Sequence, residues 1–333
     1  MNPIRLLLKP SARRFFAEAD GLGFSTGKKL HGYLYLRWPY LYIRLITGEH
    51  PLVKFMARGA RWLDKLIPSR VEKRRKAQKA SRAATGIRFA DTYHGKVMPT
   101  DEAIKLVKIG REVTVTQPES VVPYQLARDI VLKNPENIVV FDCPCRAARP
   151  NPCTPMDVCM VMGEPFAGMV LEHHKKRARR IDADEAVAIL KAENARGHVH
   201  HAFFKDVALG RFYAICNCCS CCCGAMAAQR HGVNMLASSG YVVQVDAERC
   251  VGCGNCAQFC QFGALKARDR ALQIKTARCM GCGACVSKCP KQALSLSADP
   301  SKGMPLLVEE IVQNAPNATV ATGATNHTGG QEA

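Results

Sequence analysis

Short apolar runs alternate with polar, glycine- and proline-containing stretches through the second half of the chain. Ile138–Phe141 is fully apolar and predicts a buried strand, and Arg211–Ile215 predicts another. Four more strands are predicted near the C-terminus: Tyr241–Val245, Ala264–Ala267, Leu272–Ile274 and Ala293–Leu296. Strands this short, mixed with helical segments, indicate a small α/β domain followed by a second small domain.

Apolar residues recur at helical spacing in four other segments. Proline in a first turn, aspartate caps and glycine after a last turn mark their ends. The predicted helices are residues 123–133, Asp157–Met162, Asp182 or Asp184 through Ala195 with Gly197 just beyond, and Leu306–Gln313.

The N-terminal pattern is aromatic and basic. Residues 31–46 read HGYLYLRWPYLYIRLI, Leu52–Ile67 is amphipathic, and Arg70–Arg82 is a basic run. Tyr, Trp and Arg among apolar residues suit a membrane interface, and they suit a groove on a partner protein equally well. We expect residues 1–100 to form a helical, basic extension. Three roles are open for residues 31–82 within this extension: contact with a membrane surface, contact with an acidic partner protein, or a solvated basic helix.

The charge supports this division. The chain carries +19, and residues 1–90 hold 20 Lys/Arg against 5 Asp/Glu, which is +15 of that total. Nucleic acid is not the expected partner, because no base-reading module is recognisable. No apolar run reaches the length of a membrane-spanning helix. Arg13–Arg14 lacks the apolar segment that follows a twin-arginine signal, so we expect a cytoplasmic protein. Any membrane contact is then expected to be peripheral, at the cytoplasmic face.

Eighteen cysteines change the picture most, because without a secretory signal they favour metal thiolates over disulfides. Eight form two copies of C-x2-C-x2-C-x3-C, the spacing of two-cluster bacterial ferredoxins, in which the fourth cysteine ligates the other cluster. Zinc would prefer separated CxxC pairs. The first expected [4Fe–4S] cluster is bound by Cys250, Cys253, Cys256 and Cys289, and the second by Cys279, Cys282, Cys285 and Cys260.

We therefore expect a 2[4Fe–4S] ferredoxin domain over residues 239–298, followed by a mostly flexible tail over residues 299–333. One departure stands out in the first run. Gln261 follows Cys260, whereas Pro290 closes the second run. Glutamine is not a ligand, so we expect the cluster to persist with an altered potential or exposure.

The other ten cysteines lie in residues 101–238, which we expect to form a cysteine-rich α/β domain. They are Cys143, Cys145, Cys153, Cys159, Cys216, Cys218, Cys219, Cys221, Cys222 and Cys223. The predicted strands 138–141 and 211–215 run into Cys143 and Cys216, which would face one site if the strands are neighbours. A zinc site or buried free thiols are the alternatives to further clusters.

Ten thiols suffice for one or two additional [4Fe–4S] clusters. One division places Cys143, Cys145, Cys153 and Cys159 in one cluster and four of the six later cysteines in another; a mixed division is equally open. Adjacent residues such as Cys218 and Cys219 are poor joint ligands of one small cluster. His198, His200 and His201 also lie close together in the sequence, where we expect a polar loop with solvated rings rather than metal ligands.

These motifs resemble a known family. The pattern Cys143-Pro-Cys-Arg, Cys153, Asp157-Val-Cys-Met, Ile215-Cys-Asn-Cys-Cys-Ser-Cys-Cys-Cys and the double ferredoxin run is similar to the 4Fe–4S dicluster-domain proteins of anaerobic bacteria and archaea. The resemblance covers roughly residues 118–298. It implies low-potential electron transfer in anaerobic metabolism and implies no substrate.

Two functions follow from the sequence. The leading hypothesis is an iron–sulfur protein that relays single electrons to or from a redox partner protein, as a subunit of a larger complex. The alternative is an oxidoreductase subunit with a catalytic cluster in Cys143–Cys223, where Arg146 and His198, His200 and His201 would serve as acid–base or anion-binding groups. An iron without a cysteine ligand would favour the alternative.

Overall fold

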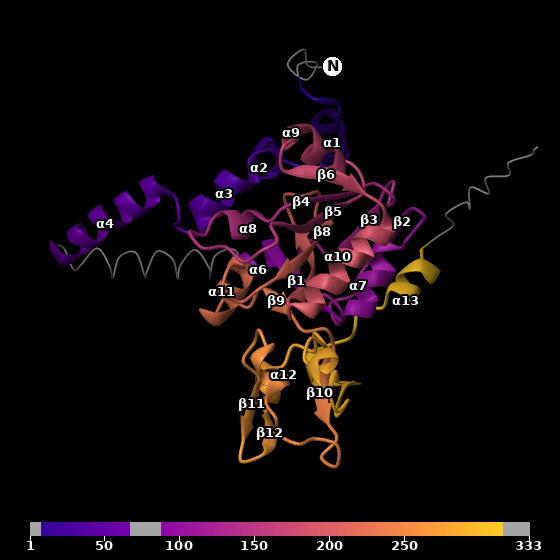
Figure 1. The fold of residues 1–333 in the computed structure, drawn as a ribbon. Coiled ribbons are helices and arrows are strands. Elements are labelled where there is room, and N and C mark those ends of the chain that lie inside the picture. The colour runs from indigo at the N-terminus through magenta and orange to yellow at the C-terminus, as the bar shows by residue number, and fades with distance from the viewer. Residues whose placement is uncertain (1–7, 67–87, 316–333) are drawn as a thin grey trace, which may run out of the picture.

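A computed structural model describes residues 8–66 and 88–315, with side chains of residues 61–66 left undescribed. A nine-stranded sheet forms the centre, helices cover it, and a small C-terminal domain hangs from one end (Figure 1). Its strands are β1 (Tyr93–Met98), β2 (Val113–Thr116), β3 (Asp129–Leu132), β4 (Ile138–Asp142), β5 (Asp157–Met162), β6 (Ala178–Ile181), β7 (Val199–Lys205), β8 (Arg211–Cys218) and β9 (Leu236–Ala237). The fold is mixed α and β, as the sequence predicts.

The strand order brings the ends of β4 and β8 to the same edge of the sheet. The order is β6-β4-β5-β8-β7-β1-β9, and β3 joins β2 to the start of β8. Both β4 and β8 are antiparallel to β5, so β4 and β8 run in the same direction and end at the same edge. They are not direct neighbours, because β5 lies between them. That edge is where both predicted strands run into cysteines.

Helices pack on the sheet through apolar faces. Helix α9 contacts β4, β5 and β6, with α1 and α2 behind it, and α10 packs with α7 near β4, β5 and β7. The helices before the C-terminal domain are α1 (Pro10–Gly21), α2 (Thr26–Arg37), α3 (Pro39–Ile46), α4 (Pro51–Leu66), α6 (Phe89–Thr92), α7 (Thr100–Val107), α8 (Pro144–Ala147), α9 (Phe166–His173), α10 (Ala183–Ala195) and α11 (Gly224–Arg230).

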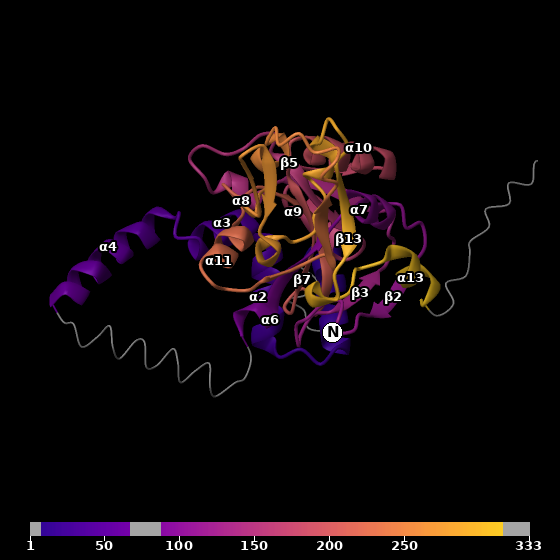
Figure 2. The ribbon, with the colours of Figure 1, turned by 90° about the horizontal axis from the view of Figure 1, so that it is seen from below.

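The N-terminal segment contributes to the central core. Phe15 and Tyr35, from α1 and α2, are buried in the same apolar cluster as the sheet. Strand β1 lies before residue 101 and pairs with β7 and β9, so the sheet begins inside the stretch assigned to the extension. Among the described helices, α4 is the one that plainly projects away from the body in both views (Figures 1 and 2). The basic run Arg70–Arg82 lies outside the described residues.

Two predicted helices are wrong. Residues 123–133 contain strand β3, and the positive φ of Ala127 (57°) is incompatible with a continuous helix there. Asp157–Met162 forms β5 instead, buried between β4 and β8. After Asp157 its sequence is apolar and shows no alternation, so periodicity cannot distinguish a buried strand from a buried helix.

The other predicted elements are confirmed within a few residues. Ile138–Phe141 and Arg211–Ile215 are β4 and β8, and the segment near Leu306–Gln313 contains α13 (Val308–Gln313). The Asp182 side chain caps α10 by accepting a hydrogen bond from the Glu185 amide, at 2.8 Å.

The C-terminal domain is built from two antiparallel pairs. The outer strands β10 (Tyr241–Val245) and β13 (Leu294–Ala298) pair, and β11 (Leu265–Arg268) pairs with β12 (Ala271–Ile274). Between them lie α12 (Asn255–Gln258), η2 (Thr276–Arg278) and η3 (Val286–Lys288), with η4 (Pro300–Lys302) following. Gly281 (φ 63°) passes so close to Tyr241 that a Cβ would lie 2.2 Å from its carbonyl oxygen. Only glycine fits there.

This domain rests on the end of α10. Asn194 Nδ2 donates to Ser287 Oγ at 3.3 Å, and Lys288 Nζ donates to the Ala195 carbonyl at 2.5 Å. Gly197, with φ 78°, ends α10, and a Cβ on it would lie 2.7 Å from the ring of Phe259. The helix end and the domain contact therefore require the same glycine. Figure 2 shows the C-terminal domain from its free end.

Candidate metal centres

Two small cavities in the C-terminal domain are each bordered by four cysteines. Their open space is about 340 and 350 Å³. In both, three cysteines of one run meet the fourth cysteine of the other run. One cavity is bordered by Cys250, Cys253, Cys256 and Cys289, and the other by Cys260, Cys279, Cys282 and Cys285.

The two crossing cysteines have matching surroundings. The Ala264 amide donates to Cys260 Sγ and the Ala293 amide donates to Cys289 Sγ, each at 3.2 Å. Such N–H···S bonds stabilise negative charge on a thiolate and are one of the means by which proteins set a cluster's potential. Four thiols around a compact apolar cavity, with amides directed at sulfur, fit a [4Fe–4S] cluster in each cavity.

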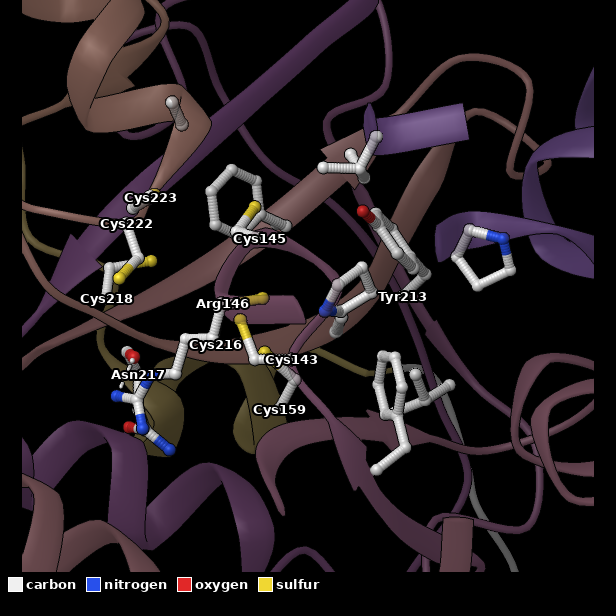
Figure 3. Close-up of a pocket in the computed structure, with 18 of the residues that line it drawn as sticks. Cys143, Cys145, Arg146, Cys159, Tyr213, Cys216, Asn217, Cys218, Cys222 and Cys223 are labelled. Carbon is white, nitrogen blue, oxygen red and sulfur yellow. Dashed lines mark hydrogen bonds between the residues drawn. The ribbon is translucent and has the colours of Figure 1, made fainter. Parts of the chain in front are cut away.

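A larger cavity lies at the edge of the central sheet where β4 and β8 end (Figure 3). We call it the thiol chamber. Cys143 follows β4, Cys159 lies on β5, and Cys216 lies on β8, so three strands supply sulfur to one space. Six thiols follow one another along its wall, each interacting with the next: Cys218, Cys223, Cys145, Cys143, Cys159 and Cys216.

The chamber is roomier than either cavity of the C-terminal domain. It contains about 790 Å³ of open space, more than twice the 340–350 Å³ of each smaller cavity. The thiol chamber is therefore the larger of the two kinds of cysteine-lined cavity in this protein.

The wall away from the thiols is aromatic and apolar (Figure 3). Tyr35 and Tyr213 line it, and their hydroxyls are hydrogen-bonded at 2.6 Å. Behind them the buried Lys205 amine lies 4.7 Å from the ring centres of Tyr35 and Tyr93. Burial lowers the pKa of Lys205 to about 8. Phenol groups thus face a sulfur-rich wall across an otherwise apolar space.

A buried ion pair lies in the lining of the thiol chamber, where Arg146 pairs with Glu193. Arg146 is 1% exposed and donates from Nη2 to Glu193 Oε2 at 2.7 Å. Burial opposes its charge, yet Glu193 and the nearby Cys143 and Cys219 raise the pKa of Arg146 above its usual range. Glu193 also hydrogen-bonds His198 at 2.7 Å. Arg146 therefore places a fixed positive charge beside the thiols while both of its terminal nitrogens are already hydrogen-bonded.

The histidine expectation is wrong. His200 and His201 lie on β7 and are almost fully buried, because every residue of that strand is covered. His200 is hydrogen-bonded to the Asn217 side chain. His201 lies against Cys218, and hydrogen bonding from Cys223 together with His201 lowers the pKa of Cys218 to about 6. Cys145 is the other chamber thiol whose pKa is lowered, by hydrogen bonding from Cys143 and Cys223. An all-buried strand gives no alternation that could have placed these rings.

Four other cysteines form a separate group, which we call the outer thiol set: Cys153, Cys219, Cys221 and Cys222. Their sulfur atoms all lie within 4.8 Å of one another. Cys153 comes from the loop after α8, and the other three from the loop between β8 and α11. The structure therefore places Cys153 apart from Cys143, Cys145 and Cys159, unlike the first division considered from the sequence.

Adjacent cysteines divide between the two groups in part. Cys218 belongs to the chamber wall and Cys219 to the outer thiol set, while Cys221 and Cys222 stay together with their sulfurs 3.5 Å apart. Burial raises the pKa of Cys221 and of Cys222 to about 11. Thiols held this close ionise readily only when a cation shares their charge.

The unusual Gln261 links the two domains. Its Oε1 accepts a hydrogen bond of 2.8 Å from the amide of Ser220, which lies between Cys219 and Cys221. A cleft of about 1230 Å³ beside this bond is bordered by both Cys221 and Cys260. A proline at position 261 would lack this acceptor, so the departure from the regular run has a structural use.

Comparison with protein families identifies the C-terminal domain. Residues 243–296 match the 4Fe-4S dicluster domain family, which spans both cysteine runs and their four strands. A comparison with curated proteins finds no match for the chain. The C-terminal domain is thus a dicluster ferredoxin domain, and cysteine clusters precede it in the chain.

Glu193→Ala should destabilise the central domain by about 3–5 kcal/mol, because it leaves the buried Arg146 charge unpaired. The measurement is anaerobic denaturant unfolding followed by circular dichroism. Arg196→Ala is the control, since its exposed guanidinium also pairs with Glu193, at 2.9 Å, and its loss should cost less than about 1 kcal/mol. Equal effects of the two substitutions would contradict this account of the buried pair.

Gln261→Ala should speed hydrogen exchange of the Ser220 amide by up to about tenfold, as expected for a hydrogen bond worth about 1 kcal/mol. Mass spectrometry of peptides spanning residues 216–224 measures this. Gln244→Ala, on the exposed side of β10, is the matched control and should leave that exchange unchanged. Unchanged exchange in Gln261→Ala would show that the bond does not hold the loop.

Proposed function

We propose that this protein relays single electrons between its two ferredoxin clusters and a further iron–sulfur cluster in the thiol chamber, to or from a redox enzyme of anaerobic metabolism. The observation that carries the proposal is the wall of six contacting thiols at the ends of β4, β5 and β8. The bound clusters would supply one-electron redox chemistry, and the protein would act as a subunit that contacts redox partner proteins.

The chain's own residues have three tasks in this proposal. The thiols hold the groups, and Arg146 offsets the negative charge that several thiolates bring to a buried site. Gln261 and the end of α10 fix the ferredoxin domain against the central domain. Because Cys260 and Cys221 border one cleft, the second ferredoxin cavity is the one that adjoins the upstream cysteines.

A second candidate is catalysis in the chamber, favoured by its size. Open space of about 790 Å³ leaves room for a small molecule beside a cubane-sized group. The hydrogen-bonded hydroxyls of Tyr35 and Tyr213 then become the nearest proton donors. Arg146 and His198 are less suited to the acid–base role considered from the sequence, because both are bound to Glu193.

Peripheral contact with a membrane through residues 31–82 is supported by the described part of that segment. Leu52, Phe55 and Met56 on α4 are 65–77% exposed, and Leu45 and Ile46 on α3 are 41% and 56% exposed. The neighbouring Arg44, Lys54 and Arg58 are exposed and basic. Apolar side chains flanked by cations match an anionic lipid surface. None of the described helices has the length and apolar character needed to cross a bilayer.

The iron count tests the proposed relay. The anaerobically purified full chain should contain about twelve or more irons with matching acid-labile sulfide, whereas two ferredoxin cubanes alone give about eight. The double variant Cys143→Ala and Cys216→Ala should fall to about eight and lose only the additional EPR signal in a redox titration. Tyr213→Phe is the control, because it alters the same chamber without removing a thiol.

About eight irons in the wild-type chain would overturn the proposal. The same samples separate the two candidates. Cyanide or carbon monoxide should change the EPR signal of the chamber cluster only if an iron is open to a small molecule, so an unchanged signal favours pure electron transfer.

Leu52→Glu, Phe55→Glu and Met56→Glu together should reduce binding to phosphatidylglycerol vesicles by about tenfold or more, because each places a charge where an apolar side chain would enter the interface. Vesicle co-sedimentation measures binding, with phosphatidylcholine vesicles for comparison. Met304→Glu replaces an apolar side chain of similar exposure (52%) far from α4 and should bind as wild type does. Wild-type chain that fails to sediment with anionic vesicles would refute the membrane contact.

A further inference from the structure

We propose that the outer thiol set binds one four-coordinate metal ion, zinc or iron, rather than an iron–sulfur cluster. The set comprises Cys153, Cys219, Cys221 and Cys222, whose sulfurs all lie within 4.8 Å of one another. Four thiolates around a single ion form the closed tetrahedral site typical of structural zinc. Iron in the same ligand set would add a one-electron centre.

Sulfur spacing distinguishes a single ion from a cluster. Four sulfurs bound at about 2.3 Å to one tetrahedral ion lie about 3.8 Å from one another. In a cubane each thiolate binds a different iron at an outer corner, so the sulfurs must stand farther apart.

The ferredoxin domain provides the comparison within the same chain. Its eight cysteines are all among the described residues. Within the described part of the whole chain, however, the outer thiol set is the one group of three or more metal-binding side chains this close together. Neither ferredoxin quartet draws its sulfurs together in this way, although each borders a cavity. The sulfurs of the outer thiol set are therefore close enough together to share a single ion, unlike those of the cluster sites in the ferredoxin domain.

The position of the set suggests what the ion does. Cys153 and Cys221 do not line the thiol chamber, whereas Cys219 and Cys222 do. The Cys153 amide also donates to Cys222 Sγ at 3.5 Å, which brings the two loops together. An ion bound here would fasten both loops over the outside of the chamber and fix part of its wall.

A disulfide is the competing use of these thiols. Cys153 Sγ and Cys221 Sγ are 2.7 Å apart, which exceeds the bond length of about 2.05 Å. A Cys153–Cys221 bond would also leave the sulfurs of Cys219 and Cys222 beside it without a partner ion. The single-ion site accounts for all four sulfurs at once.

The test is metal analysis of the full chain purified anaerobically, wild type against the double variant Cys153→Ser and Cys221→Ser. The variant should lose about one metal ion per chain with no loss of acid-labile sulfide. Loss of zinc at constant iron identifies a zinc site, and loss of one iron at constant sulfide identifies an iron site. Ser220→Ala, in the same loop, is the control and should retain the ion.

Loss of about four irons together with sulfide would overturn the proposal in favour of a cluster. A wild-type mass lower by two hydrogens under denaturing, non-reducing conditions would overturn it in favour of a disulfide. If the variant does not fold, spectroscopy of the wild-type chain decides. Zinc-edge X-ray absorption should show four sulfurs at about 2.3 Å, or iron Mössbauer spectra should show one mononuclear tetrathiolate iron beside the cluster irons; the absence of both overturns the proposal. The chamber variants alter iron and sulfide together, so failure of either proposal is recognisable separately.

Discussion

Buried thiols repel one another as they ionise, and this repulsion governs the centre of the molecule. Six thiols contact one another along one chamber wall, and several have raised pKa values, because burial and neighbouring sulfur both disfavour charge. Ionised thiols here would therefore need positive charge from a bound metal, as proposed above, and from the protein. Arg146 supplies the protein's part, and Glu193 keeps that arginine in place in a site where it is 1% exposed. The ends of β4, β5 and β8 hold the thiols at positions that a flexible loop could not maintain.

A second constraint, the fixed distance between redox centres, bears on how the two domains meet. Electron transfer needs fixed separations between centres, and here the contacts that fix them come from residues with a second task. Gly197 ends α10 and leaves room for Phe259, and Gln261 directly follows a cluster ligand and binds the Ser220 amide. The irregular residue of the first ferredoxin run thus contributes to the interface. The sequence predicts an altered exposure of the nearby cluster, and the contact of Gln261 with the Ser220 loop shows which surface lies beside that cluster.

Local repetition made part of this predictable from the sequence. The ferredoxin spacing occurs twice, and its strands and the capped helix α10 follow from short-range signals. The predictions that failed concern features that depend on tertiary structure. Strand β5 resembles a helix because it is apolar after Asp157 and lacks alternation, and His200 and His201 are buried by neighbours that lie far away in sequence. The meeting of Cys153 with Cys219, Cys221 and Cys222 depends on two loops that no local pattern relates.

The density of sulfur in residues 216–223 follows from the position of that segment. It leaves β8 at the chamber edge and becomes the partition between the chamber and the outer thiol set. Residues facing inward, Cys218 and Cys223, contact each other in the chamber wall, while Cys219, Cys221 and Cys222 approach Cys153. The proposed cluster and the proposed single ion would need ligands on the two sides of this partition within a few residues, so adjacent cysteines are expected there. Six cysteines in eight residues are thus a consequence of one loop serving two sites.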